Sequence, residues 1–250
     1  MNLPLLTSPS LTSAGFAHGF STRQGGVSPP PYDTLDFAML REPNQLRENQ
    51  RRLAEALGFD VSRFYQATQV HGRAVVVAEG DPAALAKQEA DALVATSGSK
   101  AAVAVRVADC VPVLVADPVT GNVAAIHAGW RGVEARVVDA AVEALRGDPS
   151  RMVAAIGPSI GPCCFEVGAD VAEKIDASTG VDVVDRRDEA RGKAYVDLRR
   201  GVRAQLRRLG LADASIDDVP GCTRCDAERF YSYRRDGDAS GRLVGVIVAR

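Results

Sequence analysis

Three apolar segments follow one another between residues 101 and 127, and they limit what this chain can fold into more than any other feature. Residues 101–107, 111–116 and 122–127 are almost continuous in small and branched apolar side chains. A strand with no polar side is typical of a sheet that is covered on both faces. We therefore predict three central strands with further layers of protein above and below them.

The second and third of these segments are joined by DPVTGN, residues 117–122. This connection is too short for a helical crossover, so it predicts an antiparallel hairpin. Adjacent antiparallel strands combined with helices favour a mixed α/β sandwich over a regular array of βαβ units. Further strands are predicted over residues 16–22, 74–78, 152–156 and 243–249.

Four helices are predicted from apolar residues at three- and four-residue steps and from capping residues. Asn44 and Asp197 can cap the N-termini of the first and last, while Gly58 and Gly210 end them. The two middle helices are predicted over about residues 132–145 and 166–178. A loop is predicted at the glycine- and proline-rich stretch 25–32, and an exposed excursion at the charged stretch 182–192.

The bulk properties narrow the class of protein. The 250 residues, 46% of them hydrophobic, suit a single domain over 1–250. A net charge of −2 gives no reason to expect nucleic acid or a membrane as partner, and neither a signal peptide nor a membrane helix is expected. Five cysteines, an odd number in a chain that does not need disulfides, predict a cytoplasmic protein with free thiols.

Two of the three histidines and one cysteine stand where predicted strands run into loops. They are His71 in TQVHG, Cys110 in VADCVP and His127 in AIHAGWRG, called here the His–Cys–His trio. Taken singly, each has an ordinary explanation as a surface, packing or loop residue. Together they fit a zinc site with two imidazoles and one thiolate, whose free fourth position suits catalysis.

Charged residues near these positions could complete a site. Asp109 lies in an apolar run, where a carboxylate needs a partner, and it could orient a metal ligand. Arg23 precedes Gly25 and Gly26, and a guanidinium beside backbone N–H groups suits phosphate. Two further arginines are weaker candidates for phosphate binding, Arg131 and Arg234.

The other four cysteines form two pairs in the sequence. Cys163 and Cys164 in GPCCFE are predicted to be structural, because the flanking proline and phenylalanine suggest a tight packed turn. Cys222 and Cys225 form a CxxC motif, which is a weak signal for zinc when no second half-site accompanies it. Neither pair is predicted to bind a metal.

Eight segments spread over nearly the whole chain resemble the YfiH/YlmD family. In order they are GFSTRQGGVSPPPYDTLDFA, TQVHG, ADALVA, ADCVPVLVADP, AAIHAGWRG, AAIGPSIGPCCFEVG, DLRRGVRAQL and FYSYRRDGDASGR. The resemblance implies an α/β (α+β mixed) fold, a single-domain layered sandwich of mixed sheets flanked by helices, similar to the YfiH-like cysteine hydrolase fold. It also implies that the His–Cys–His trio supplies the zinc-binding and catalytic residues.

The activity that the resemblance implies is that of a zinc-dependent purine nucleoside phosphorylase with adenosine deaminase activity. Its substrates would be phosphate and adenosine, inosine, guanosine or methylthioadenosine, and the protein would be a monomer or a homodimer. Three alternatives stay open: a Cys/His amidase of peptidoglycan editing that acts on muropeptide precursors, a copper-dependent polyphenol oxidase, and a non-enzymatic binding module. Copper is the less favoured metal, since a multicopper centre needs many imidazoles.

Overall fold

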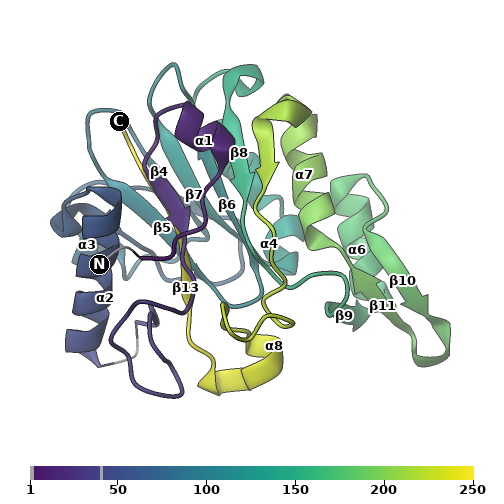
Figure 1. The fold of residues 1–250 in the computed structure, drawn as a ribbon. Coiled ribbons are helices and arrows are strands. Elements are labelled where there is room, and N and C mark those ends of the chain that lie inside the picture. The colour runs from purple at the N-terminus through teal and green to yellow at the C-terminus, as the bar shows by residue number, and fades with distance from the viewer. Residues whose placement is uncertain (1–2, 40–41) are drawn as a thin grey trace.

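Two β-sheets packed face to face form the centre of the molecule, in a computed structural model that describes residues 3–39 and 42–250 (Figure 1). The six-stranded sheet has the order β12 (Ile216–Asp218), β8 (Val153–Ile156), β6 (Val111–Ala116), β7 (Val123–Ala128), β4 (Ala92–Ala95) and β3 (Val75–Val77). The four-stranded sheet has the order β1 (His18–Phe20), β13 (Leu243–Val248), β5 (Ala102–Val107) and β2 (Phe64–Tyr65).

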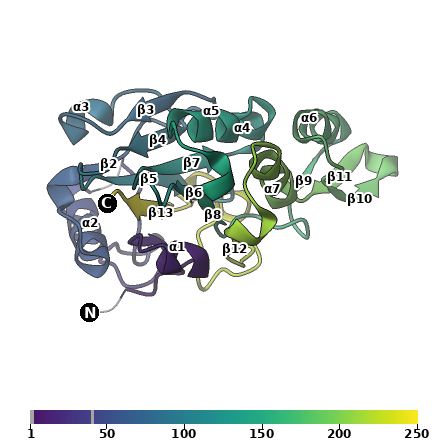
Figure 2. The same ribbon diagram turned by 90° about the horizontal axis from the view of Figure 1, so that it is seen from above.

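Helices cover both outer faces of the sheet pair, as the view from above shows (Figure 2). Those on the side of the six-stranded sheet are α4 (Trp130–Glu134), α5 (Val137–Ala144), α6 (Ala169–Thr179) and α7 (Leu198–Arg208). On the other side, α2 (Pro43–Leu57) covers the four-stranded sheet, and α1 (Pro9–Ser13) packs against β8 and β12 of the six-stranded sheet. Two short helices complete the set, α3 (Pro82–Leu85) and α8 (Tyr233–Asp236).

The central strands are covered on both faces, as their composition predicts. In β5, Val103 and Val105 pack between the two sheets, against residues such as Leu114 of β6. The alternate side chain Ala104 faces the outer layer and shares a cluster with Leu53 of α2. Every residue of β6 and β7 is buried, so the mixed α/β sandwich is confirmed.

The predicted hairpin is present between β6 and β7. The two strands pair antiparallel from Val111 with Ala128 to Ala116 with Val123. Asp117 N donates to Asn122 O at 2.9 Å and closes the turn. This register sets Cys110, just before β6, beside the end of β7.

Two predicted helices differ from what the structure has. The one expected over 132–145 is broken into α4 and α5, because Arg136 adopts a left-handed conformation with φ 62°. The one expected over 166–178 starts late, since Glu166–Gly168 forms strand β9 and α6 begins only at Ala169. The second difference arises because β9 pairs with β11 (Lys193–Val196), a tertiary contact that overrides the local helical pattern.

The charged stretch 182–192, predicted as an exposed excursion, forms most of a hairpin that projects from the body of the molecule (Figure 1). Its strands β10 (Val184–Asp188) and β11 (Lys193–Val196) pair antiparallel, and β11 also pairs with β9. The remaining single turns are 3₁₀ helices at Val61–Arg63, Pro149–Arg151, Glu189–Arg191, Asp213–Ser215 and Gly237–Ala239. In the described part of the chain, no helix combines the length and the apolar character that crossing a bilayer requires.

Candidate functional site

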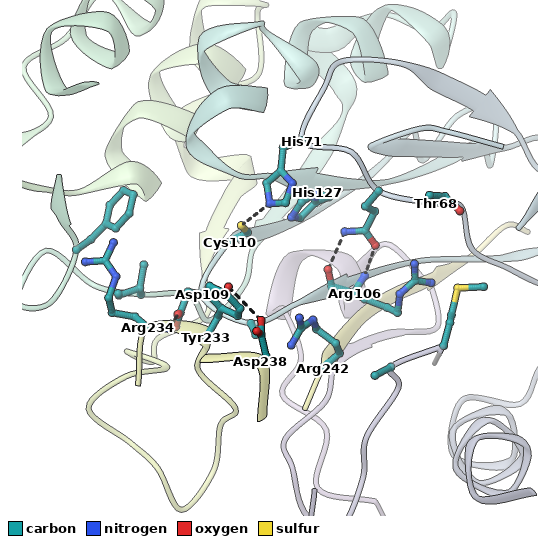
Figure 3. A pocket seen from close by; sticks show the side chains of 16 residues that line it. Thr68, His71, Arg106, Asp109, Cys110, His127, Tyr233, Arg234, Asp238 and Arg242 are labelled. Carbon is teal, nitrogen blue, oxygen red and sulfur yellow. Dashed lines mark hydrogen bonds between the residues drawn. The ribbon is translucent and has the colours of Figure 1, made fainter. Parts of the chain in front are cut away.

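The fold brings the His–Cys–His trio together from three separate segments. His71 lies in the loop between β2 and β3, Cys110 in the loop between β5 and β6, and His127 near the end of β7. Their ligand atoms all lie within 4.8 Å of one another. Cys110 Sγ is 3.8 Å from His71 Nε2, and Figure 3 shows both side chains next to His127.

Backbone geometry at the loop ends aims these side chains at one point. His71 has φ 59° and Asp109, which precedes Cys110, has φ 87°. Residues other than glycine rarely adopt such left-handed conformations, and those that do cluster at functional sites. The chain therefore turns sharply at two of the three places where it presents a ligand.

A residue that the sequence reasoning missed, Asp91, holds the two histidines in place. It lies just before β4, and none of its side chain is exposed. Its Oδ1 is 2.7 Å from His127 Nδ1 and also accepts the backbone N–H of His71 at 2.9 Å. Its Oδ2 accepts the N–H of Gly72 at 2.6 Å. One carboxylate thus orients the imidazole of His127 and shapes the loop that carries His71, as partners of metal-binding histidines commonly do.

The charges within the trio reinforce one another. Burial alone would raise the pKa of the Cys110 thiol, but His127 and His71 outweigh it and lower that pKa to about 6. Burial alone would lower the pKa of His127, but Cys110 and Asp91 outweigh it and raise that pKa to about 9. For Asp91 itself, the hydrogen bonds from His127 and backbone N–H groups outweigh burial, so its pKa is lowered.

The donor set fits a zinc ion. Bond lengths of about 2.3 Å to sulfur and about 2.0 Å to nitrogen place tetrahedral ligands about 3.5 Å apart. Cys110 Sγ and His71 Nε2 are 3.8 Å apart, so only a small contraction is needed. The contact of His127 Nδ1 with Asp91 leaves Nε2 as the nitrogen for the metal. Three protein ligands leave a fourth position free.

The trio forms part of the wall of a pocket with a volume of about 850 Å³. That size is in the range of sites for small organic ligands. The remaining lining combines apolar, aromatic and polar side chains with three arginines and two aspartates: Ala38, Met39, Thr68, Gln69, Arg106, Ala108, Asp109, Ile160, Phe165, Tyr233, Arg234, Asp238 and Arg242.

Arg106 and Arg242 make this pocket suited to an anion, and the sequence reasoning missed both. Arg106 Nη2 donates to Ala67 O at 2.8 Å, but its Nη1 is buried and has no partner among the described residues. Burial and the charge of Arg242 lower the pKa of Arg106 to about 10. Arg242 Nη1 donates to Ser240 O at 2.9 Å and to Gly241 O at 3.0 Å. An anion bound beside the two guanidinium groups would reduce the repulsion between them.

The predicted phosphate-binding loop lies elsewhere. Arg23 and Gly25 line a separate hollow of about 340 Å³. The Arg23 guanidinium donates to Asp33 O at 2.9 Å and to Ala227 O at 3.1 Å, so its donors already stabilise the local chain. The Gly26 N–H donates to a threonine hydroxyl at 2.9 Å. The structure therefore does not bring Arg23, Gly25 and Gly26 to the pocket of the trio, because their loop lies against the segment that contains Ala227.

Of the other three predicted site residues, Asp109 and Arg234 line the pocket of the trio and Arg131 does not. Asp109 lines the pocket, but its carboxylate accepts from Thr223 Oγ1 and from the backbone N–H of Arg234, both at 2.6 Å, rather than orienting a histidine. Arg234 also lines the pocket. Arg131 is exposed and its guanidinium stacks on Trp130, 4.4 Å from the ring centre, outside the residues that line the pocket.

A comparison with protein-family models gives one family for most of the chain. Residues 17–250 match the model described as "Multi-copper polyphenol oxidoreductase laccase". Multicopper centres need more imidazoles than the trio offers. The third histidine of the chain, His18, is buried and bonds to Phe16 O and Ser8 N, each at 2.8 Å.

Relatives of this chain carry the name of an enzyme. It is 40% identical to "Purine nucleoside phosphorylase SCO2081" of Streptomyces coelicolor, over 94% of this chain and 96% of that protein. It is 41% identical to "Purine nucleoside phosphorylase" of Deinococcus radiodurans, over 98% and 92%. The crystal structure of YlmD from Geobacillus stearothermophilus matches with a TM-score of 0.88 and 30% identity, over 97% of this chain and 94% of that one.

Proposed function

The chain belongs to the YfiH/YlmD family, whose model carries the polyphenol oxidoreductase laccase description, and we propose that it is a zinc-dependent purine nucleoside phosphorylase. The proposal rests on one pocket whose wall carries both a set of metal ligands and a pair of arginines. The His–Cys–His trio supplies a three-ligand metal site. Arg106 and Arg242 supply paired positive charge where an anionic co-substrate can bind.

Phosphorolysis makes two demands that this pocket can meet. A phosphate oxygen attacks C1′ of the ribose while the C1′–N9 bond breaks, so phosphate must be held close to the sugar. Arg106 and Arg242 would hold it through charge-assisted hydrogen bonds. The departing purine takes up electrons and needs a proton or a cation near its ring nitrogen. Tyr233, which lines the pocket and is half exposed, offers an aromatic side chain for contact with the base.

The same site supports a second reaction in the proposal, hydrolytic deamination of adenosine. Water replaces the amino group at C6 of the purine and ammonia leaves. A zinc ion at the trio would supply Lewis acidity and lower the pKa of a water at the free position to about 7. Asp91 would keep His127 oriented and the loop of His71 closed around the site.

A panel of nucleosides tests the proposal. Inosine, guanosine, adenosine and methylthioadenosine are each incubated with the zinc-loaded protein, with and without phosphate, and the products are separated by chromatography. We expect free base only when phosphate is present, and inosine from adenosine with or without it. Release of base that does not depend on phosphate would contradict phosphorolysis.

Arg242→Gln should weaken the binding of phosphate without preventing the reaction. Loss of one charge-assisted hydrogen bond costs about 1.5–3 kcal/mol, so we expect the KM for phosphate to rise about 10- to 100-fold. The KM for inosine should change much less. Arg131→Gln is the matched control, because this exposed arginine stacks on Trp130 outside the pocket lining. Equal effects of both substitutions would argue against phosphate binding at Arg242.

Zinc binding at the trio should depend on pH with a predictable sign. The thiolate of Cys110 forms above about pH 6, whereas His127 keeps its extra proton up to about pH 9. Zinc must displace that proton, so between these two values its affinity should rise about tenfold per pH unit. Below about pH 6 the thiol proton also competes and the dependence should steepen. Competition titrations with a chelating dye measure this, and an affinity independent of pH would contradict it.

A second candidate function rests on a specific contact. Cys110, His127 and Asp91 also form a nucleophile, a base and a carboxylate that orients the base, the arrangement of a cysteine hydrolase. Such an enzyme would be an amidase, with muropeptide precursors as one possible class of substrate. The position of His71 beside the sulfur favours the metal site, because a metal-free triad needs only one histidine.

Chelation and alkylation separate the two functions. A metal-free cysteine hydrolase keeps its activity when zinc is removed and loses it when Cys110 is alkylated. The zinc enzyme loses activity on chelation and recovers it when zinc is added back. UDP-linked muropeptides, tested beside the nucleosides, give the amidase its own substrate.

A further inference from the structure

We propose that the chain binds a second zinc ion, at a purely structural site made by Cys163, Cys164, Cys222 and Cys225. The four Sγ atoms, called here the cysteine cluster, all lie within 4.8 Å of one another. The sequence suggested that the CxxC motif has no second half-site. The structure corrects this, because the fold sets the Cys163–Cys164 pair beside it.

The spacing of the sulfur atoms fits one tetrahedral ion. Zinc–sulfur bonds of about 2.3 Å place the sulfurs of a Cys₄ site about 3.8 Å apart. Cys163 Sγ is 3.5 Å from Cys222 Sγ and 3.6 Å from Cys225 Sγ, and Cys164 Sγ is 3.2 Å from Cys225 Sγ. All four thiols are free. A four-iron cluster needs its thiolates further apart, since iron and sulfide stand between them, so a single ion fits best.

The backbone around the cysteine cluster is fixed from both sides. Ser159 and Cys222 form a parallel β-bridge that joins the two segments. Within the first segment, Cys164 N donates to Gly161 O at 2.9 Å, and within the second, Asp226 N donates to Cys222 O at 3.0 Å. The thiols are therefore held in position before any ion binds, which reduces the entropy lost on binding.

Hydrogen-bond donors and cations near the cysteine cluster can stabilise the negative charge of a zinc site made of four thiolates. Four thiolates and one Zn²⁺ carry a net charge of −2. The Gly161 N–H points at Cys222 Sγ at 3.3 Å, and Arg224 Nη1 lies 3.5 Å from Cys164 Sγ. Arg235 Nη1, 2.9 Å from Thr223 O, brings a second guanidinium to the same loop. Hydrogen bonds and cations of this kind stabilise metal-bound thiolates.

Hydrogen bonds connect the segments of the cysteine cluster to the loop that carries Cys110. Thr223, between the two cysteines of the CxxC motif, donates to Asp109 Oδ1 at 2.6 Å. Ile160, three residues before Cys163, donates its N–H to Asp109 O at 3.0 Å. Each of the two segments that would share the ion therefore donates a hydrogen bond to Asp109, the residue that precedes Cys110. A zinc ion here would fix the loop that presents the thiol of the trio.

The test isolates the second site by emptying the first. In His71→Ala/Cys110→Ala protein supplied with zinc, we expect one zinc ion per chain by elemental analysis. X-ray absorption should show about four sulfur ligands at about 2.3 Å and no nitrogen ligand. No bound metal, iron in place of zinc, or a shell of nitrogen and oxygen would overturn the proposal. Disulfides among the four cysteines, detected by mass spectrometry of the unreduced protein, would also overturn it.

A complementary variant keeps the trio and removes the cysteine cluster. Cys163→Ser/Cys225→Ser changes the two exposed cysteines and should lower the zinc content from two ions per chain to one. Unchanged zinc content would contradict the proposal. If this variant does not fold, the absorption measurement still decides, because it uses an intact cysteine cluster. The outcome at this site is independent of whether the pocket acts on nucleosides.

Discussion

Cys110→Ala is expected to abolish the release of hypoxanthine from inosine and phosphate. The substitution removes the one thiolate of the trio, and two histidines alone cannot hold zinc with comparable affinity. Loss of the charge stabilisation that a metal supplies corresponds to several kcal/mol in the transition state. We expect kcat/KM to fall about 10³-fold or more. Initial rates of base release, measured beside the zinc content, test this.

The control for this prediction is the unaltered protein after its zinc is stripped and restored. Stripping should reproduce the loss seen in Cys110→Ala, and restoring zinc should recover activity only in the protein that keeps the thiol. Full activity in Cys110→Ala would reject the assignment of the trio. Activity that survives stripping but not the substitution would favour the cysteine hydrolase.

Asp91→Asn should damage stability and metal binding together. Both carboxylate oxygens accept: Oδ1 from His127 and His71, and Oδ2 from Gly72. An asparagine amide must turn its NH₂ group, which only donates, toward one of these donors. With the buried charge pair also lost, we expect a destabilisation of about 3 kcal/mol. Zinc affinity should fall about 10- to 100-fold.

Asp117→Asn separates the two effects. Asp117 is also fully buried, but it accepts from the N–H of Val119 in the β6–β7 turn, away from the pocket. Only Oδ1 of Asp117 accepts hydrogen bonds, so an asparagine keeps that acceptor. This control should therefore cost less stability than Asp91→Asn and leave zinc affinity unchanged. Denaturation curves and competition titrations on both variants provide the measurements. If Asp91→Asn binds zinc as tightly as the unaltered protein, Asp91 does not position the ligands.

The sequence predicted those parts of the fold that depend on local pattern. The three apolar segments could only be central strands, and DPVTGN was too short for anything except a hairpin. The trio was found because histidine and cysteine are scarce in this chain and stand at strand ends. The helix break at Arg136 could not be predicted, because residues other than glycine rarely adopt a left-handed conformation and nothing in the local sequence signals one.

The site residues that the sequence did not reveal have partners that are far away in the sequence and close only in the folded chain. Asp91 begins an apolar strand in ADALVA, and the reasoning applied to Asp109, that a buried carboxylate needs a partner, would have found it. Arg106 looks like one charge in an apolar run, and only the fold sets it beside Arg242. Arg23 was attractive because glycines follow it, yet its guanidinium donates to Asp33 O and Ala227 O in a hollow separate from the pocket of the trio.

The most direct test of the central claim is a ³¹P NMR measurement of inosine and inorganic phosphate incubated with zinc-loaded protein. We expect ribose 1-phosphate to appear in the same amount as hypoxanthine, and neither product to form after the zinc is removed or in Cys110→Ala protein. Hypoxanthine without ribose 1-phosphate, or an unchanged phosphate signal with the zinc-loaded protein, would contradict the assignment of a metal-assisted phosphorolysis to this pocket.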